Sequence, residues 1–269
     1  MARQTIIITG ASAGIGEAAA RELSQDNDVV IVGRSKKRTA ALAKELSVPY
    51  YVADYSDLST VRTLAKDLLR AYPRIDVLIN NAGGVMQEIK KTKDGFEETF
   101  QVNYLAQFVL TNLLLDRLIA SKGGVINTAS AANRSSLLKL KDLQAVKSTW
   151  IAYSNTKLLD IIHAKELSRR FGSKGIVAVS VHPGIVATSF AKRLKGPFAW
   201  LYNTSLKRLI KTPEGGADTI VWLARNRNLW VPGAYYSNRT VRKPHRLATD
   251  IVKASSIWNK TEALLEANK

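Results

Sequence analysis

Short apolar segments alternate with helical patterns along most of the chain, and this rhythm restricts the fold more than any other feature. The apolar segments are TIIITG (5–10), DVVIVGR (28–34), PYYVAD (49–54), DVLINNAG (76–83), GGVINTAS (123–130) and GIVAVSVHPG (175–184). Strands that are apolar on both faces and alternate with helices predict a parallel sheet covered on both sides. Right-handed crossovers then make a doubly wound α/β sandwich, in which ligands bind beyond the carboxyl ends of the strands.

The intervals between these segments carry helical patterns, with no linker, repeat or low-complexity tract between them. The patterns lie at residues 14–25, 37–46, 58–72, 96–121 and around 150–160. Asp57 is expected to cap the third of them. A chain of 269 residues, 46% of them hydrophobic, suits one soluble domain with a sizeable core. We therefore predict a single domain over residues 1–269.

The cysteine and histidine content excludes several kinds of site. The chain has no cysteine, which rules out disulfides and thiolate metal sites. None of its three histidines (His163, His182 and His245) forms a cluster with carboxylates that suggests a metal, and His182 is expected to be a structural turn residue. The run TIIITG is too short for a signal-peptide core or a spanning helix. We therefore predict a cytoplasmic protein without a metal site.

The net charge of +18 is the least ordinary global property of the sequence. Basic residues concentrate at 192–211 and again at 239–246. A basic surface attracts phosphates, nucleic acid and anionic lipid, but solvated lysines and arginines explain the excess equally well. No nucleic-acid partner is expected, while peripheral contact with an anionic membrane surface is left open.

The segment TGASAGIG, directly after the first apolar run, predicts a nucleotide-binding loop. Glycines permit a sharp turn, a close approach of the backbone to a pyrophosphate and tight helix–strand packing, and the free N–H groups of the helix start face the phosphates. The spacing Gly-x-x-x-Gly-x-Gly resembles the loop of the short-chain dehydrogenase/reductase family, which has a Rossmann fold. The residues expected to bind the cofactor here are Gly10, Ser12, Ala13, Gly14, Ile15 and Gly16.

Arg34, at the end of the second apolar segment, predicts the choice of nicotinamide cofactor. An acidic residue at this place would bind the ribose hydroxyls of NAD(H). A guanidinium instead suits a 2′-phosphate through charge-assisted hydrogen bonds, and Ser35 follows it. We therefore expect NADP(H) in preference to NAD(H), although an exposed basic turn without a ligand fits the same residues.

The family resemblance implies further cofactor contacts. Asp54 matches an aspartate that bonds the adenine amino group, with the backbone N–H of Tyr55 beside it. The motif NNAG implies contacts along the adenosine ribose and the phosphates, and HPGIVATSF implies a turn followed by residues that hold the carboxamide. The residues concerned are Asn81, Ala82, Gly83, Pro183, Val186 and Thr188.

Tyr153 and Lys157 stand four positions apart in WIAYSNTKLLD, residues 150–160. Residues four apart lie on one face of a helix. An ammonium beside a phenol favours the phenolate and lowers a phenol pKa that is ordinarily about 10, so that the tyrosine serves as a general acid or base near neutral pH. By itself the spacing also fits two polar-tipped residues on the edge of a packed helix.

The resemblance gives this pair two partners. Ser130, at the end of INTAS, and Asn103, in QVNYLAQF, match the family's serine and asparagine. The resemblance implies that Ser130 polarises the substrate carbonyl and that Tyr153 is the general acid in reduction and the general base in oxidation. It also implies that Lys157 bonds the nicotinamide ribose, and that Asn103 bends its helix and holds a water. The expected activity is NADP-dependent hydride transfer between nicotinamide and a carbonyl or alcohol.

The interval between Ser130 and Tyr153 indicates a branch of the family. It is longer than in many members and resembles that of retinol dehydrogenases, WW-domain oxidoreductases and light-dependent protochlorophyllide reductases. The C-terminal stretch agrees, and the missing cysteine disfavours the last group. Residues 189–212 are expected to form a lid over an apolar substrate, because they contain Phe190, Phe198, Trp200, Leu201 and Tyr202.

Three other interpretations remain open. A catalytically silent NADP-binding sensor or scaffold would keep the fold, but it would normally have lost Ser130, Tyr153 or Lys157. An epimerase or dehydratase of the superfamily uses a similar pair, in a longer chain with different glycine spacing. Binding to anionic surfaces through the basic clusters would add to catalysis. A small-molecule substrate is expected in each enzymatic case, and homo-oligomerisation is left open.

Overall fold

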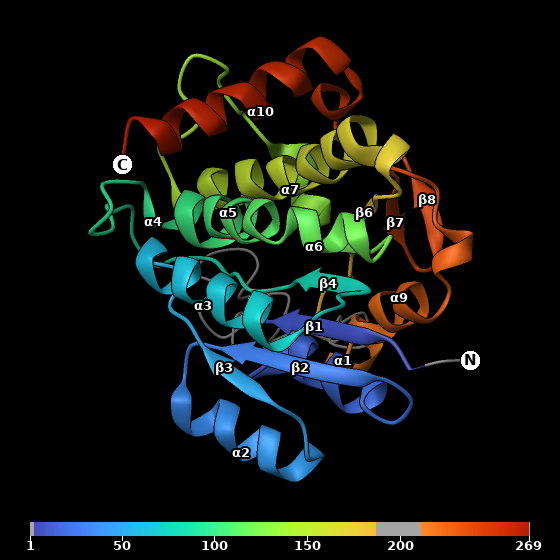
Figure 1. Cartoon of the computed structure of the whole chain (residues 1–269). Coiled ribbons are helices and arrows are strands. Elements are labelled where there is room, and N and C mark those ends of the chain that lie inside the picture. The colour runs from blue at the N-terminus through green and yellow to red at the C-terminus, as the bar shows by residue number, and fades with distance from the viewer. Residues whose placement is uncertain (1–2, 187–210, 269) are drawn as a thin grey trace, which may run out of the picture.

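The computed structural model describes residues 3–186 and 211–268, and its centre is one eight-stranded sheet (Figure 1). The order of its strands is β3-β2-β1-β4-β5-β6-β7-β8, and all neighbours are parallel except β7 and β8. The strands are β1 (Thr5–Thr9), β2 (Asp28–Gly33), β3 (Tyr50–Val52), β4 (Val77–Asn80), β5 (Gly124–Thr128), β6 (Val177–His182), β7 (Tyr235–Ser237) and β8 (Thr240–Arg242). The predicted doubly wound α/β fold is confirmed.

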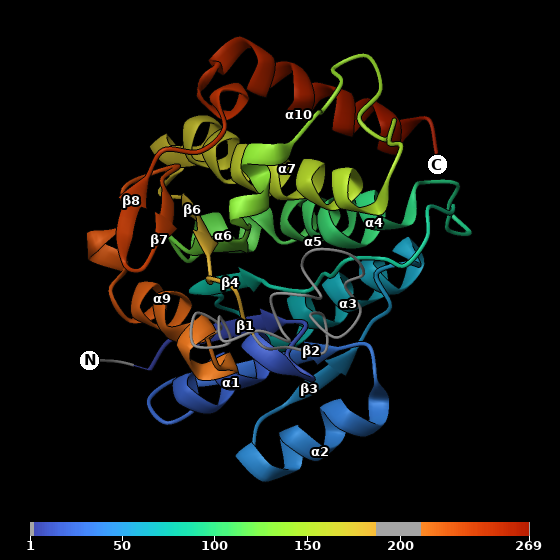
Figure 2. The same cartoon turned by 180° about the vertical axis from the view of Figure 1, so that it is seen from behind.

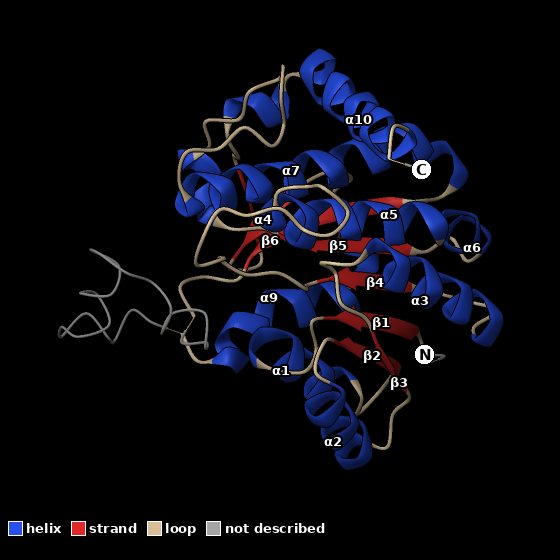
Figure 3. Ribbon diagram, turned by 90° about the vertical axis from the view of Figure 1, so that its left-hand side faces the viewer, coloured by secondary structure: helices blue, strands red, loops and turns tan. Residues whose placement is uncertain are grey.

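Helices cover both faces of the sheet. The longer ones are α1 (Gly14–Leu23), α2 (Lys36–Leu46), α3 (Leu58–Ala71), α5 (Ala106–Leu113), α7 (Thr149–Phe171), α9 (Pro213–Arg225) and α10 (Ile251–Glu266). Helices α1, α2 and α9 pack on one face, and α3, α5 and α7 on the other, with α10 lying over α7 (Figures 1 and 3). Within the described ranges, no helix combines the length and apolar character needed to cross a bilayer.

The alternation of side chains along β1 explains the two layers. Ile6 and Ile8 enter the core cluster shared with α1 and α9, whereas Ile7 enters the one shared with α3, α5 and α7. Successive residues of a strand point to opposite faces of the sheet, so an uninterrupted apolar strand needs cover on both sides. The run of isoleucines in β1 is therefore buried completely.

The expected continuous helix over residues 96–121 is wrong. The structure divides it into α4 (Glu98–Phe100), a π-helical turn (Gln101–Leu105), α5, and α6 (Leu115–Ala120). Asn103 lies in the π-helical turn, where its side chain bonds to the backbone of Gly84. The departure from regular geometry thus coincides with a long-range contact of Asn103, and π-helical turns within helices commonly accompany functional sites.

Two strands were not foreseen, and several termini differ by a residue or more. The segments β7 and β8 are three residues each and form an antiparallel hairpin at the sheet edge. The second and third helical patterns become α2 and α3, with bounds that differ by one residue. The Asp57 cap is confirmed, because its carboxylate accepts a hydrogen bond from the Ser59 N–H at 2.9 Å. The lid predicted at 189–212 lies outside the described residues, except for its last two.

Candidate active site

The residues expected to hold a nucleotide gather where β1 and β4 end, at the point where the strand order changes direction. In doubly wound sheets this switch point is where ligands bind. Thr9 ties the two strand ends together: its hydroxyl donates to the carbonyl of Ile79 and accepts from the N–H groups of Asn81 and Ala82, at 3.0–3.2 Å. The glycine loop leaves β1 directly after this threonine (Figure 3).

The glycine loop has the geometry that its sequence predicts. Gly10 adopts a φ of +66°, and a Cβ there would lie 2.7 Å from the Cα of Ala82. At Gly16 a Cβ would lie 2.5 Å from the Asn81 Nδ2 and 2.6 Å from the Gly10 carbonyl oxygen. Both contacts are closer than real Cβ contacts, so only glycine lets α1 start this close to β4.

Gly16→Ala is expected to lower the free energy of unfolding by about 1–3 kcal/mol and to weaken nucleotide binding, because the added methyl has no room to relax. Gly172→Ala is the matched control, since its Cβ would meet nothing within 4 Å and its backbone is helical. That change should be neutral or stabilising by about 0.4–1 kcal/mol. Denaturant unfolding with and without NADPH measures both, and equal effects in the two variants would contradict this account of the loop.

The start of α1 is free to bind an anion. Its N-cap residue, Ala13, provides no side-chain hydrogen bond, whereas α2, α3, α7, α9 and α10 are each capped by a side chain. Uncapped N–H groups and the positive end of the helix dipole attract phosphate. The loop and α1 therefore fit the pyrophosphate of a dinucleotide, and Ser12, Ala13, Gly14 and Ile15 all lie at this turn.

Basic residues follow β2 where the adenosine end of a dinucleotide would lie. Arg34 is exposed, and no carboxylate of residues 3–186 and 211–268 pairs with its guanidinium. Ser35 caps α2 by accepting a hydrogen bond from the Arg38 N–H at 3.4 Å. Asp54 follows β3, and one of its carboxylate oxygens accepts from the Ser56 N–H and hydroxyl at 3.0 and 2.8 Å.

The remaining cofactor residues are partly engaged within the protein. The Asn81 amide donates to the Thr9 carbonyl at 3.0 Å, so this side chain joins strand ends. The ring of Tyr55 is buried, so what it offers to a ligand is its backbone N–H. Pro183 follows β6, and Val186 pairs its backbone with Lys211, while Ala82 and Gly83 continue the loop after β4. Thr188 lies outside the described residues.

Tyr153 and Lys157 lie together at the carboxyl end of β5. The Lys157 ammonium donates to the carbonyl of Thr128, two residues before Ser130, at 2.8 Å. Its Nζ is 5.6 Å from the centroid of the Tyr153 ring. The half-buried tyrosine and the buried lysine are therefore adjacent, and both stand next to the loop that carries Ser130.

Two residues orient this group. Asn103 donates from its side-chain amide to the Thr156 hydroxyl at 3.2 Å, and that hydroxyl donates to the Tyr153 carbonyl at 2.8 Å. His182 accepts, through its Nδ1, from the Ala131 N–H at 3.2 Å. Burial, assisted by Lys211 and Arg134, lowers the pKa of His182 to about 4, so its imidazole is neutral and accepts hydrogen bonds near pH 7. This agrees with the structural role expected of it.

Sequence reasoning missed Asp160, whose carboxylate accepts from the Lys157 ammonium at 2.8 Å. A signal was present, because Asp160 is the one acidic residue in the apolar run LLDIIHA, three positions after the lysine. Residues three apart on a helix are neighbours. Attraction to this carboxylate and to Tyr153 outweighs burial and raises the pKa of Lys157 above its ordinary value.

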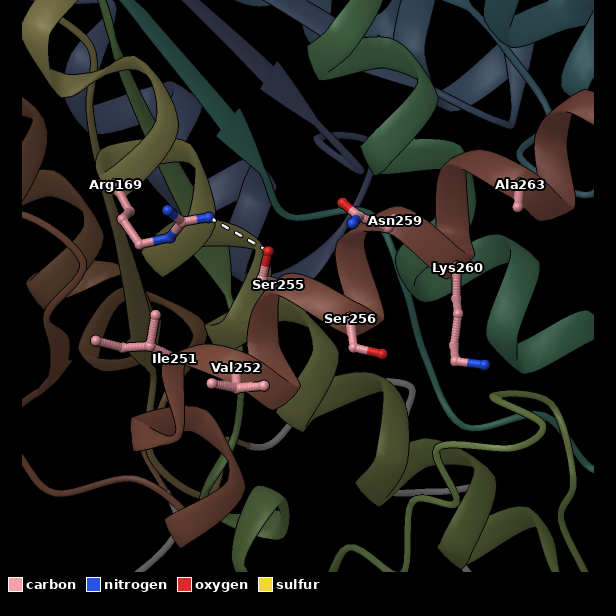
Figure 4. A pocket seen from close by; sticks show the side chains of 8 residues that line it. All are labelled: Arg169, Ile251, Val252, Ser255, Ser256, Asn259, Lys260 and Ala263. Carbon is pink, nitrogen blue, oxygen red and sulfur yellow. Dashed lines mark hydrogen bonds between the residues drawn. The ribbon is translucent and has the colours of Figure 1, made fainter.

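A hollow of about 620 Å³ lies elsewhere, on the outer face of α10 (Figure 4). It is shallow and contains none of the predicted site residues, and α7 contributes only Arg169 to it. Arg169 lies twelve positions beyond Lys157, or about 18 Å along the helix. The strand ends, with their convergent polar groups, are therefore the better candidate site. No group of metal-ligating side chains occurs in the described part of the chain.

Comparison with known proteins agrees with this placement of the motifs. The family model described as short chain dehydrogenase matches residues 4–196. A protein of Streptomyces sp. (strain C5), provisionally named as the daunorubicin C-13 ketoreductase DnrU, is 35% identical over 97% of this chain and 92% of its own length. Human retinol dehydrogenase 13 is 33% identical over 97% of this chain and 84% of its own length.

A solved structure adds the fold over the full length. An uncharacterized protein from Mycobacterium paratuberculosis superimposes with a TM-score of 0.80 and 29% identity, over 98% of this chain and 94% of its own. The sequence matches cover the glycine loop, the Tyr-Lys helix and the C-terminal stretch alike. The chain belongs to the short-chain dehydrogenase/reductase family of oxidoreductases, in its retinol dehydrogenase-like branch.

Proposed function

We propose that this protein is an NADP-dependent oxidoreductase that interconverts a carbonyl and an alcohol. One observation carries the proposal: the Lys157 ammonium bonds to the Thr128 carbonyl and lies beside the Tyr153 ring. That contact puts the proton-transfer pair next to Ser130, at the same edge of the sheet as the glycine loop. A nicotinamide cofactor bound along that edge supplies or accepts the hydride at its C4 atom.

The side chains have distinct roles in the proposed reaction. Tyr153 donates a proton to the carbonyl oxygen in reduction and removes it from the alcohol in oxidation. The Lys157 ammonium stabilises the phenolate and bonds the nicotinamide ribose, while the Ser130 hydroxyl binds and polarises the substrate oxygen. Asn103 acts indirectly, because its hydrogen bond to Thr156 fixes the turn of α7 that carries Tyr153.

The residues that follow β2 support NADP(H) over NAD(H). Arg34 is exposed and unpaired within the described residues, directly after β2, and Lys36, Lys37 and Arg38 follow. Hydrogen bonds between a guanidinium and a phosphate are stronger than hydrogen bonds between neutral groups. Position 34 carries this arginine and not the carboxylate that would bind the ribose hydroxyls of NAD(H). The glycine loop and the uncapped α1 support binding of the shared pyrophosphate.

Arg34→Ala is expected to raise the KM for NADPH about 10- to 100-fold, the equivalent of losing a hydrogen bond to a charged group. The KM for NADH should change less than about twofold, because that cofactor has no 2′-phosphate for the arginine to bind. Arg242→Ala is the matched control, an exposed arginine of β8 at the far edge of the sheet. An equal rise of the KM for NADPH and for NADH would show that Arg34 does not bind the 2′-phosphate.

The natural substrate is proposed to be apolar. The names of the relatives refer to the C-13 ketone of daunorubicin and to retinol, and retinol, a polyene alcohol, is apolar. The aromatic residues of the segment 189–212 support the same class, although they lie outside the described residues. A cytoplasmic location remains a prediction, and homo-oligomerisation remains open.

Turnover of NADPH with a panel of aldehydes, ketones and quinones, with NADH run alongside, tests the proposal. We expect turnover with apolar carbonyls and a preference for NADPH. Tight NADPH binding without turnover of any compound, in either direction, would instead support the catalytically silent sensor. Better use of NADH would overturn the cofactor assignment while leaving the reaction class intact.

A further inference from the structure

A buried ion pair lies inside the proposed catalytic group. The side chains of Lys157 and Asp160 are 6% and 1% exposed, and their Nζ and Oδ2 atoms are 2.8 Å apart. The Lys157 ammonium therefore donates one of its three N–H groups to Asp160 and a second to the Thr128 carbonyl. An ammonium that serves a tyrosine by its charge alone needs no carboxylate beside it, so the pairing requires a separate explanation.

Among the groups around Asp160, Lys157 is its charged partner, and Lys157 in turn lies beside the Tyr153 ring. From β5, the Asn127 amide donates to the Asp160 main-chain carbonyl at 3.0 Å. His163, one turn along α7, is kept neutral because burial lowers its pKa to about 3. Burial also raises the pKa of Tyr104, from the π-helical turn, so it stays protonated. From α10, Glu262 faces Tyr104, but it is exposed and screened by water.

We propose that Asp160 is a positioning residue that raises the pH at which the Tyr153–Lys157 pair releases its proton, and so biases the site towards carbonyl reduction at neutral pH. The proposal rests on the proposed oxidoreductase function. Reduction needs the protonated tyrosine as proton donor, whereas oxidation needs the phenolate as proton acceptor. Whatever delays release of the proton therefore favours reduction.

The direction of the effect follows from the net charge of the buried group. With Asp160 ionised, the charges of the Tyr153 phenol, the Lys157 ammonium and the Asp160 carboxylate sum to zero, and loss of one proton leaves a net negative charge. With a neutral residue at 160, the same loss takes the group from one positive charge to zero. A net charge is costly in a poorly solvated site, so the carboxylate opposes proton release. This holds whether the proton leaves the tyrosine or the lysine, because the resulting net charge is the same.

The Asp160 carboxylate is ionised at neutral pH. Burial raises the pKa of Asp160 to about 6, against the lowering effect of Lys157. The carboxylate is therefore mostly ionised at pH 7, and the 2.8 Å contact with a charged donor agrees with an ion pair. The ion pair also fixes the Lys157 side chain, which bonds α7 to β5 through the Thr128 carbonyl. The experiment must therefore separate an electrostatic role of Asp160 from a merely structural one.

Titration of Tyr153 in the protein without substrate tests the proposal directly. In protein labelled with ¹³C at the tyrosine Cζ, the Tyr153 resonance is assigned by its loss in Tyr153→Phe. We expect its titration midpoint to fall by about one pH unit or more in Asp160→Asn, the usual size of the effect of a nearby charge. Asp160→Ser, which also removes the charge, should shift it in the same direction and replaces the first variant if that one fails to fold.

Glu166→Gln is the matched control. It removes another buried carboxylate of α7, which pairs with Arg169 and Arg170 nine positions from Lys157, or about 13.5 Å along the helix. We expect no shift of the Tyr153 midpoint in this variant. An unchanged midpoint in both Asp160 variants, with a lower melting temperature, would reduce Asp160 to a structural role. An upward shift would overturn the proposal, since Asp160 would then act by keeping Lys157 protonated.

Steady-state kinetics give a second measurement, which distinguishes a failure of the Asp160 proposal from a failure of the proposed oxidoreductase function. With an alcohol and its carbonyl from the turnover panel, Asp160→Asn should move the pH midpoint of oxidation downward. At pH 7 and saturating substrates, the ratio of the turnover number for oxidation to that for reduction should rise about tenfold, the equivalent of one pH unit. The corresponding ratio of kcat/KM values is fixed by the reaction equilibrium and should not change. If the wild-type protein turns over no substrate, the oxidoreductase function fails while the tyrosine titration still decides the role of Asp160.

Discussion

Tyr153→Phe is expected to lower the turnover number for carbonyl reduction by about 1,000-fold, within the range that general acid–base catalysis contributes. The change removes the hydroxyl that donates the proton and leaves the ring in place, where it packs against Trp150 with the ring centroids 5.9 Å apart. Lys157 keeps its bonds to Thr128 and Asp160. Steady-state rates with a saturating carbonyl and NADPH measure the loss, and the melting temperature and NADPH affinity should remain near those of the wild type.

Tyr104→Phe provides the control for loss of a buried tyrosine hydroxyl. Its hydroxyl bonds to Thr261 of α10 at 2.9 Å, so the variant should lose about 1 kcal/mol of stability and retain its turnover number. Retained turnover in Tyr153→Phe would overturn the proposed mechanism. A similar loss of turnover in both variants would point to a general effect on the fold.

Trp258→Ala is expected to lower the free energy of unfolding by about 3–5 kcal/mol, the usual cost of truncating a buried aromatic residue to alanine. The indole is 2% exposed and attaches α10 to the helices beneath it. Its ring packs edge-on to Phe108 at 4.7 Å between centroids, and the Arg170 guanidinium lies 4.9 Å above it. Both contacts are lost together with the buried area, and denaturant unfolding measures the sum.

Val252→Ala tests whether this cost belongs to the buried face of α10. Val252 is on the same helix but is 79% exposed, on the outer hollow (Figure 4), so its truncation should change stability by less than about 0.5 kcal/mol. A loss below about 1 kcal/mol in Trp258→Ala would mean that α10 contributes little to the core.

The sheet was predictable because its pattern is local. Each of the six strands from β1 to β6 is an apolar run of its own, and each of the first five is followed by a loop and a helical pattern. Parallel strands, right-handed crossovers and cover on both faces then follow from general rules. The glycine loop and the placement of Lys157 next to the Ser130 loop follow in turn, because both depend on where strands end.

The departures arise from contacts between distant residues. The helix break around Asn103 depends on bonds to Gly84, and no helical pattern carries that information. The hairpin of β7 and β8 is too short for alternation to be visible, and it forms only because β6 offers a free edge. Asp160 was detectable in principle, as a charge within an apolar run, but a single acidic residue on a helix is ordinarily solvated.

The packing of α9 against α1 joins two helices that are synthesised far apart in time. Helix α9 lies beside α1 (Figure 2). Gly216 of α9 lies against Ile15 and Val186, and Ile6 and Ile8 of β1 share a core cluster with α9. About 190 residues separate the end of α1 from the start of α9, which at roughly 5–20 residues per second takes about 10–40 seconds to synthesise. During that time the cover over Ile6 and Ile8 lacks the part that α9 supplies, so the core on this side of the sheet closes late in synthesis.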